Sequence, residues 1–188
     1  MTRLGIGVVG AGSIGIRGAL AHLSLEDVLY ALTGILGPAK SVVALSGIAI
    51  RQREFEGSLH ECDADDNSLL LLDFGASVFA FVHGTFAGSL TRLGEVNVYG
   101  SEGTVEGELH NDAPLEYPSE RRLPHVTDAH GALEEAHVFE DVMQLVDWVR
   151  DDIPSVCDAD HARHVIEIIE AAYRSAETRR AQDLETTF

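Results

Sequence analysis

The residues with the clearest potential for chemistry form a glycine-rich turn near the start of the sequence. Gly10, Gly12 and Gly15 follow the G-x-G-x-x-G pattern, directly after an apolar segment and directly before one with helical spacing. Glycine lets the backbone approach a phosphate closely, and the free amides of a helix N-terminus attract it. The residues predicted to contact a dinucleotide pyrophosphate are therefore Gly10, Gly12, Ser13, Ile14 and Gly15. A purely structural turn is the alternative.

The elements around this turn are incomplete for dinucleotide binding. Residues 4–9 predict a buried strand and residues 14–22 a helix, but a second helix follows, beginning at Ser24 and stopping at Gly37. A complete site also needs a second strand that ends in an acidic residue about 20 positions on, which holds the ribose. The pair Glu26-Asp27 lies near that distance, yet we interpret it as the N-terminal charges of a helix.

From residue 41 onward, apolar residues alternate with polar ones, a pattern typical of half-buried strands. The turns at residues 75–77 and 100–103 are short enough to require antiparallel neighbours. The predicted strands are residues 41–50, 67–74, 78–86, 95–99 and 104–109, with a weaker one at 58–62.

Two amphipathic helices are predicted after a long surface loop at residues 111–131. They span residues 136–150 and 160–180, and we expect them to cover one face of the sheet. The predicted fold class is α+β: a mostly antiparallel sheet backed by C-terminal helices, with a remnant Rossmann strand, turn and helix at the N-terminus. The other sheet face would stay uncovered, which predicts a homodimer or larger assembly. The apolar residues expected on it include Leu70, Leu72, Phe79 and Phe81.

The composition argues against several classes of partner. The chain has 31 Asp and Glu against 13 Lys and Arg, a net charge of -18 at pH 7, so it would repel nucleic acid. No stretch is apolar enough for a membrane span and the N-terminus lacks signal-peptide features, so we expect a cytoplasmic protein. Cys62 and Cys157 lie far apart, which argues against a disulfide framework. The abundant Asp and the single lysine, Lys40, are typical of proteins from salt-accumulating halophiles.

Other candidate sites are weaker, and we predict no metal site. His161 and His164 share a helix face at i, i+3 spacing, but the sequence offers no obvious third ligand. Residues 63–67 begin like a calcium loop but lack its glycine and final glutamate, so we interpret them as a solvated turn. His83, on a predicted strand, is interpreted as a hydrogen-bonded sheet residue, with a substrate-facing role as the alternative.

Several segments, in order along the chain, resemble the Gfo/Idh/MocA family of NAD(P)-dependent oxidoreductases. The opening GIGVVGAGSIGIRG is similar to that family's first strand and turn, and LYALTGILGPAKSVVALSG to the helix and strand that begin its second domain. VNVYGSEGTVEGEL resembles its sheet strand and turn, and ADHARHVIEIIEAAYRSAET its last helix, with Arg179 where glycine is common. The resemblance covers nearly the whole chain. It implies NAD or NADP as cofactor and a sugar, inositol or similar polyol as small-molecule substrate.

The resemblance breaks between Leu23 and Leu29, where the family carries the rest of its nucleotide-binding domain. The family's Glu-Lys-Pro motif, with its catalytic lysine, has no counterpart, and Lys40 lies in a different element. The family's Asp-x-x-x-His motif is also missing there, and its histidine position falls on or near Asp27. Without a base for the hydroxyl proton and a donor for the alkoxide, we predict no catalytic residue, and weak or absent cofactor binding.

These inferences predict a shortened protein of an oxidoreductase family. Residues 1–26 would be a remnant of a dinucleotide-binding domain, and residues 27–188 a sheet domain similar to the family's C-terminal one. Its partners, as the resemblance implies, would be a second copy through the sheet face and a small-molecule substrate. Two alternatives stay open: a non-catalytic homo-oligomeric sheet module, and the truncated product of an active dehydrogenase.

Overall fold

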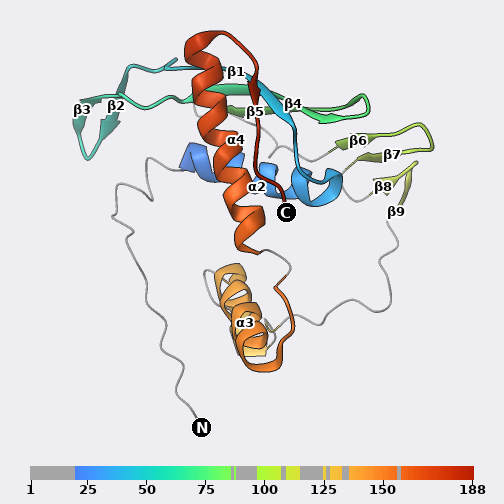
Figure 1. Cartoon of the computed structure of the whole chain (residues 1–188). Helices are drawn as coiled ribbons and strands as arrows, with labels where there is room; N and C mark the ends of the chain where they lie inside the picture. Colours follow the sequence, from blue (N-terminus) through green and yellow to red (C-terminus); the bar gives the residue numbers. More distant parts are fainter. Residues whose placement is uncertain are drawn as a thin grey trace. The chain divides into compact units, whose positions relative to one another are not determined.

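The computed structural model describes residues 20–85, 87, 97–106, 109–114, 125, 128–132, 136–155 and 158–188. The chain divides into two compact units (Figure 1). One takes in Met1–Leu93 with His164–Phe188, and the other takes in Gly94–Arg163. The strand predicted at residues 4–9, the glycine turn after it and Cys157 lie outside the described residues.

A four-stranded antiparallel sheet, here called the main sheet, organises the first unit, with strand order β10-β1-β4-β5. Its strands are β1 (Ser41–Gly47), β4 (Asn67–Gly75), β5 (Val78–Thr85) and β10 (Gln182–Asp183). The antiparallel pairing of β4 with β5, expected from the short turn between them, is confirmed, and β1 pairs antiparallel with β4. The turn between β4 and β5 holds Ala76 and Ser77 at φ angles of 53° and 64°, the left-handed pair that favours a two-residue hairpin.

The pairing register decides which residues face the helices. Leu70 and Leu72 of β4 are 3% and 1% exposed, whereas Phe79 and Phe81 of β5 are 70% and 64% exposed. The register pairs Phe81 with Leu71, so Phe81 and Leu71 share one face and Leu70 and Leu72 lie on the other. The expectation that all four residues line the open face is therefore wrong for the two leucines.

Helices α2 (Leu20–Leu36) and α4 (Ala159–Thr178) cover the other face of the main sheet (Figure 1). The core of the unit lies between these layers. Its largest fully buried side chains include Leu29 of α2, Leu72 of β4 and Ile168 of α4. The predicted α+β class, an antiparallel sheet backed by helices, is confirmed.

The beginning of α2 differs from the prediction. The sequence predicts a helix start at Ser24, but α2 is continuous from Leu20 to Leu36. That prediction is wrong because serine inside a helix costs only about 0.5 kcal/mol, which the neighbouring leucines and alanine offset. The predicted end is confirmed, since Gly37 adopts a left-handed φ of 81° and its amide donates to the Thr33 carbonyl.

The second unit contains a small antiparallel sheet and a helix. Its elements are β6 (Asn97–Tyr99), β7 (Thr104–Glu106), β8 (Leu109–His110), β9 (Ala113–Pro114), a 3-10 helix (Asp128–Ala132) and α3 (Ala136–Asp151). The strand predicted at 104–109 is thus divided into β7 and β8, and the loop predicted at 111–131 includes β9 and the 3-10 helix. The helix predicted at 136–150 is confirmed as α3, which belongs to this unit, while α2 joins α4 in the first.

A separate hairpin of β2 (Gln52–Phe55) and β3 (Ser58–Glu61) projects from the first unit. β3 confirms the weak strand predicted at 58–62. β2 went unpredicted because its sequence, Gln-Arg-Glu-Phe, has no alternation of apolar and polar residues. In the part of the chain that the structure describes, no helix combines the length and apolar character that crossing a membrane requires.

Candidate functional site

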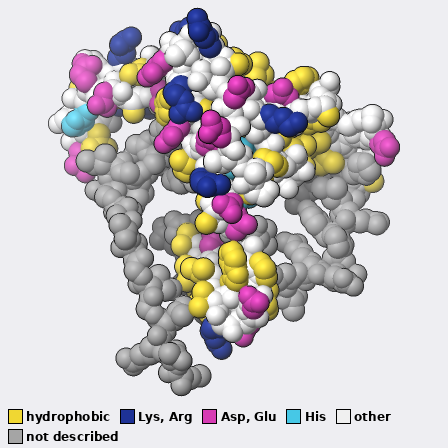
Figure 2. Space-filling view, in the orientation of Figure 1, with side chains coloured by type: hydrophobic (Ala, Val, Ile, Leu, Met, Phe, Trp, Pro, Cys, Tyr) yellow, Lys and Arg dark blue, Asp and Glu magenta, His cyan; other side chains and the backbone are white. Residues whose placement is uncertain are grey.

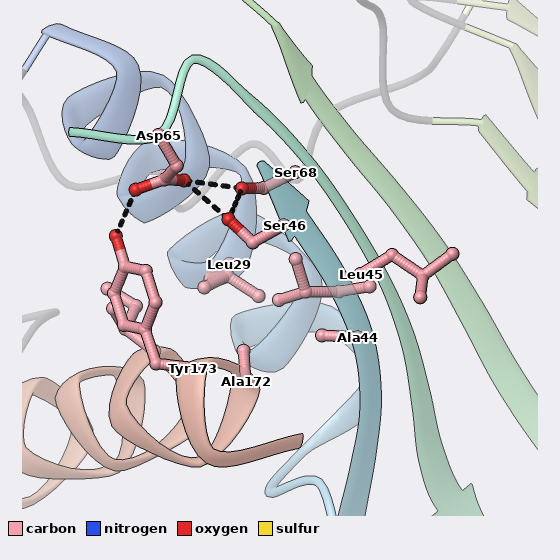
Figure 3. A pocket seen from close by; sticks show the side chains of 10 residues that line it. Leu29, Ala44, Leu45, Ser46, Asp65, Ser68, Ala172 and Tyr173 are labelled. Carbon is pink, nitrogen blue, oxygen red and sulfur yellow. Dashed lines mark hydrogen bonds between the residues drawn. The ribbon is translucent and has the colours of Figure 1, made fainter. Parts of the chain in front are cut away.

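Four polar side chains converge beside the covered face of the main sheet (Figure 3). Asp65, in the connection before β4, accepts hydrogen bonds through Oδ2 from the hydroxyls of Ser46 at 2.9 Å and Ser68 at 2.5 Å. Its Oδ1 atom accepts a hydrogen bond from the Tyr173 hydroxyl of α4 at 2.8 Å. This Asp65 cluster therefore ties β1, β4 and α4 together at one point.

A small cavity adjoins the Asp65 cluster, with a volume of about 20 Å³. That volume admits about one water molecule, so neither a nicotinamide nor a sugar fits. Burial, together with the hydrogen bond to Asp65, raises the pKa of Tyr173, so its hydroxyl stays a proton donor and does not act as a base. The cluster fastens the fold, and the cavity beside it is too small to hold a substrate. The apolar part of the cavity wall consists of Leu29, Ala44, Leu45, Leu70, Ile169 and Ala172.

Asp66 anchors the loop that follows β1. Its carboxylate accepts hydrogen bonds from the amides of Ala49 at 2.7 Å and Ile50 at 3.0 Å, and forms an ion pair with Arg53 at 2.8 Å. The Ala49 hydrogen bond, helped by Arg53 and opposed by desolvation, lowers the pKa of Asp66. The interpretation of residues 63–67 as a solvated turn is therefore wrong for Asp65 and Asp66, because backbone amides and hydroxyls replace water around them.

The open face of the main sheet is hollowed at one end. The hollow has a volume of about 550 Å³, and its polar groups include His83 and Asn67, which are joined by a 2.9 Å hydrogen bond. The interpretation of His83 as a hydrogen-bonded sheet residue is confirmed. The volume of this hollow lies within the range of about 300 to 1,000 Å³ that is common for ligand pockets. The hollow is nevertheless open to solvent on an apolar sheet face. Its lining consists of residues 45–49, Asn67, Leu69, Phe81 and His83.

A histidine in the second unit lies between two carboxylates of α3. His125 contacts Glu140 through Nδ1 at 3.2 Å and Asp147 through Nε2 at 2.9 Å. Burial opposes ionisation of Glu140, but hydrogen bonds from His125 and Gln144 outweigh it and lower the pKa of Glu140. Because both ring nitrogens of His125 have partners, this arrangement holds the chain against α3 and leaves no nitrogen for a substrate.

The glycine-turn residues Gly10, Gly12, Ser13, Ile14 and Gly15 lie outside the described residues, so phosphate binding by them stays a prediction. Asp27 belongs to α2, and its side chain also lies outside the described part of the structure. Lys40 follows α2, and its ammonium occupies the space that a Cβ at Gly75 would need. Gly75 itself has a φ of 84°. Lys40 thus covers the end of β4.

The surroundings of His164 and His161 do not suit a metal site. His164 is fully buried, its Nε2 accepts the Ala39 amide at 3.0 Å, and its Nδ1 lies 2.9 Å from the Thr186 hydroxyl. Burial lowers the pKa of His161. Among the described residues, no three His, Cys, Asp or Glu are placed to hold a metal ion. The sequence also has one Asp-x-x-x-His spacing, from Asp160 to His164 in α4, but the contacts of His164 keep it from any substrate.

Sequence reasoning missed the Asp65 cluster because it is built from distant parts of the chain. Tyr173 lies 108 positions from Asp65, and Ser46 lies 22 positions from Ser68. One signal was present: Ser68 stands two residues before Leu70, at a position where alternation calls for a buried apolar side chain. A polar residue on a core-facing position needs a hydrogen-bond partner, so Ser68 implies a cluster without naming its members.

Comparison with protein families gives one match over most of the chain. The profile described as "Oxidoreductase family, C-terminal alpha/beta domain" matches residues 17–184. Comparison with curated proteins found no match.

Solved structures with the same fold cover most of this chain. An oxidoreductase from Agrobacterium radiobacter, in complex with NAD+, L-tartaric acid and magnesium, is 18% identical with a TM-score of 0.60, over 93% of this chain and 54% of its own. The WlbA dehydrogenase from Bordetella pertussis, with NADH and UDP-GlcNAcA, is 17% identical with a TM-score of 0.58, over 85% and 43%. A super-repressor mutant of Gal80p from Saccharomyces cerevisiae is 12% identical with a TM-score of 0.60, over 87% and 49%. The chain spans about half the length of these structures.

Proposed function

We propose, from the premise that this chain belongs to the Gfo/Idh/MocA oxidoreductase family, that it is the C-terminal sheet module of an NAD(P)-dependent sugar, inositol or polyol oxidoreductase and does not catalyse hydride transfer alone. The observation that carries this proposal is the burial of His164. Oxidation of an alcohol needs a base near the hydroxyl proton. The one histidine with Asp-x-x-x-His spacing, His164, is fully buried with both ring nitrogens hydrogen-bonded. It cannot fill that role.

The nature of cofactor and substrate is proposed from the solved neighbours. The Agrobacterium oxidoreductase is described with NAD+ and L-tartaric acid, and the Bordetella dehydrogenase with NADH and UDP-GlcNAcA. Both sets pair a nicotinamide dinucleotide with a small hydroxylated molecule. By family membership, NAD or NADP is the cofactor type and a small polyol-like molecule the substrate type for the complete enzyme. The glycine turn at residues 10–15 would contribute the only phosphate contacts we assign, because its helix start offers free amides.

The alternative is a non-catalytic module that assembles through its sheet. The same fold occurs in Gal80p, whose solved structure is that of a super-repressor mutant. The fold is therefore compatible with a role in repression. The open face of the main sheet favours self-association, since Val43, Leu45 and Leu71 are 44%, 49% and 51% exposed beside the phenylalanines of β5. We expect a homodimer or larger assembly through this face both for the module of an oxidoreductase and for the non-catalytic module. A cytoplasmic location, and a domain boundary after residue 26, complete the proposal.

Cofactor titration tests the proposal directly. Calorimetry with NAD+ and with NADP+ should give a dissociation constant of millimolar or weaker, because a glycine turn alone lacks the adenosine, ribose and nicotinamide contacts of a dinucleotide domain. A panel of polyols should give no NAD(P)H, since a positioned acid or base contributes a factor of about 10² to 10⁴.

The Gly12→Asp variant is the matched control for the titration, because a carboxylate in the turn repels a pyrophosphate. Any residual heat of binding should disappear in this variant. Micromolar affinity or steady turnover by the unaltered chain would overturn the proposal and make Asp27, Tyr30 and His83 the first residues to substitute. If the coding sequence proves longer than 188 codons, the hypothesis that this chain is the truncated product of an active dehydrogenase replaces the other two hypotheses.

A further inference from the structure

The buried ring of His164 joins three parts of the first unit. Its Nε2 atom lies 3.0 Å from the Ala39 amide, in the connection between α2 and β1. Its Nδ1 atom lies 2.9 Å from the Thr186 hydroxyl. The ring of Phe188 packs against it, with centroids 5.7 Å apart. α4 is therefore linked through one side chain both to the start of the main sheet and to residues 184–188, here called the C-terminal strap.

The hydrogen-bond donors fix the protonation state of this ring. A backbone amide can only donate, so Nε2 of His164 must be the bare nitrogen that accepts from Ala39. The Thr186 hydroxyl donates its one proton to the Glu167 carboxylate in a short hydrogen bond, so it accepts from Nδ1 of His164. The ring is consequently neutral, with its proton on Nδ1. A second proton, on Nε2, would point directly at the Ala39 N–H.

The C-terminal strap is held by a small number of contacts. The Leu184 amide donates to the Lys40 carbonyl at 2.9 Å. The amides of Glu185 and Thr186 donate to the two oxygens of Glu167 at 2.8 Å and 2.9 Å. Together with Thr186 and Phe188 at His164, these contacts keep the strap beside the outer edge of β1, where β10 pairs with Ser41 and Val42.

A charged side chain of α4 faces the ring. Glu167, on α4, has an oxygen 3.9 Å from Nδ1 of His164. Burial opposes its ionisation, but hydrogen bonds from Thr186 and the Glu185 amide hold the pKa of Glu167 below its ordinary 4.5. Glu185 of the strap is exposed, and Lys40, beside Ala39, is exposed over Gly75. Glu167 therefore keeps its charge throughout the range in which an imidazole titrates.

We propose that His164 is a pH-sensitive latch, and that its protonation releases the C-terminal strap from α4. In the closed form, a proton on Nε2 of His164 removes the hydrogen bond from the Ala39 amide and leaves two N–H groups facing each other. His164 is fully buried, so water does not satisfy these donors. When the strap leaves, Thr186 and Phe188 no longer cover the ring, and the imidazolium can be hydrated. Protonation thus favours the open form. An exposed imidazole with a pKa of about 6.5 makes opening up to about 30-fold more favourable at pH 5.0 than at neutral pH.

Amide hydrogen exchange of the full chain, corrected for intrinsic rates, tests the latch at pH 7.5 and pH 5.0 in molar potassium chloride. Peptides that cover residues 182–188 should lose protection by about 10- to 30-fold at the lower pH. In His164→Gln the amide oxygen accepts from Ala39 and the amide nitrogen donates to Thr186 without titrating, so protection should change less than about 3-fold. His83→Gln, which alters an exposed histidine on the open face, should behave as the unaltered chain.

Two results would overturn the latch. One is equal protection of the strap at both pH values in the unaltered chain. The other is a pH-dependent loss in His164→Gln as large as in the unaltered chain, which would assign the effect to another group. If His164→Gln fails to fold, Thr186→Val decides: it removes the strap's contact with the ring, so protection should be low at both pH values and differ little between them. A full 10- to 30-fold change in Thr186→Val would equally refute the proposal.

Discussion

Acidic residues in this chain fall into two physical classes, which share a charge but differ in what surrounds it. Asp65, Asp66 and Glu167 receive hydrogen bonds from amides, hydroxyls or a guanidinium, and so hold separate segments together. Asp63, two residues before Asp65, is exposed to solvent and belongs to the second class. A carboxylate that accepts several hydrogen bonds is stabilised in its ionised form, which links its charge to the folded state.

Asp66 gives the first class a direct test at the scale of one residue. Asp66→Asn keeps the size of the side chain but loses the ion pair with Arg53 and weakens the hydrogen bonds from Ala49 and Ile50. The pKa of Asp66 is lowered from its ordinary 3.8, so the stability it contributes is complete above pH 3.8 and is lost as pH falls through the lower folded value. At pH 7 the variant should melt a few degrees below the unaltered chain.

The difference between the two proteins should shrink toward zero as pH falls from 4 toward 2. Differential scanning calorimetry across this range measures it. Asp63→Asn is the matched control, and it should melt within about one degree of the unaltered chain at every pH. An Asp66→Asn difference that persists undiminished in acid would assign its effect to packing and not to charge.

At the scale of elements, the open face of the main sheet is the feature that most needs a partner. Phe79 and Phe81 are 70% and 64% exposed, and burying each stabilises an assembly by about 1.5 to 3 kcal/mol. The double change Phe79→Ser and Phe81→Ser should therefore weaken self-association at least about 100-fold. Light scattering over a range of concentration and salt measures this. Leu59→Ser, also 70% exposed but on the β2–β3 hairpin, should leave the assembly intact.

An unaltered chain that stays monomeric at all concentrations would contradict self-association. Equal weakening by Leu59→Ser and by the double variant would place the interface elsewhere on the surface. Either result leaves the fold unchanged, because the covered face of the sheet, with α2 and α4 against it, does not depend on the open one.

Elements with a strong period were predictable from the sequence, and those without one were not. Alternation in Ser41–Gly47, Asn67–Gly75 and Val78–Thr85 predicted the three long strands, and the short turn at residues 75–77 predicted the antiparallel pairing of β4 with β5. It could not say which set of alternating residues faces the helices, since both faces of β4 and β5 are apolar. β10 spans only Gln182–Asp183 and exists through its pairing with β1, a contact that no local pattern records.

The same limit applies to the polar contacts. In sequence, Tyr173 is an ordinary helix residue and His164 is one member of a weak metal-binding pair. Their observed roles come from partners that are 108 and 125 positions away. A local motif such as Gly10 to Gly15 can be named from sequence because its chemistry lies in consecutive backbone amides. Clusters assembled by the fold can only be suspected, through a polar residue at a core position such as Ser68.

At the scale of the whole molecule, charge is the dominant physical property. Acidic side chains are spread over the face seen in Figure 2 and do not gather in one patch. With a net charge of -18 and a pI near 4.7, the chain repels itself at neutral pH, and compaction brings these charges closer. Self-repulsion opposes both folding and the assembly expected through the sheet face. Mobile ions should relieve it.

We therefore expect the melting temperature at pH 7.5 to rise with potassium chloride. The Debye length falls from about 30 Å at 0.01 M to about 3 Å at 1 M, so repulsion between separate surface charges is largely removed over this range. A gain of only 1 kcal/mol would raise the midpoint by about 2 to 4 °C in a chain of this length. Sucrose is the matched control, because it stabilises by exclusion without screening and should not reproduce the steep rise at low concentration. A midpoint that is flat or falls between low and molar salt would contradict the self-repulsion argument, and with it the halophile interpretation of the composition.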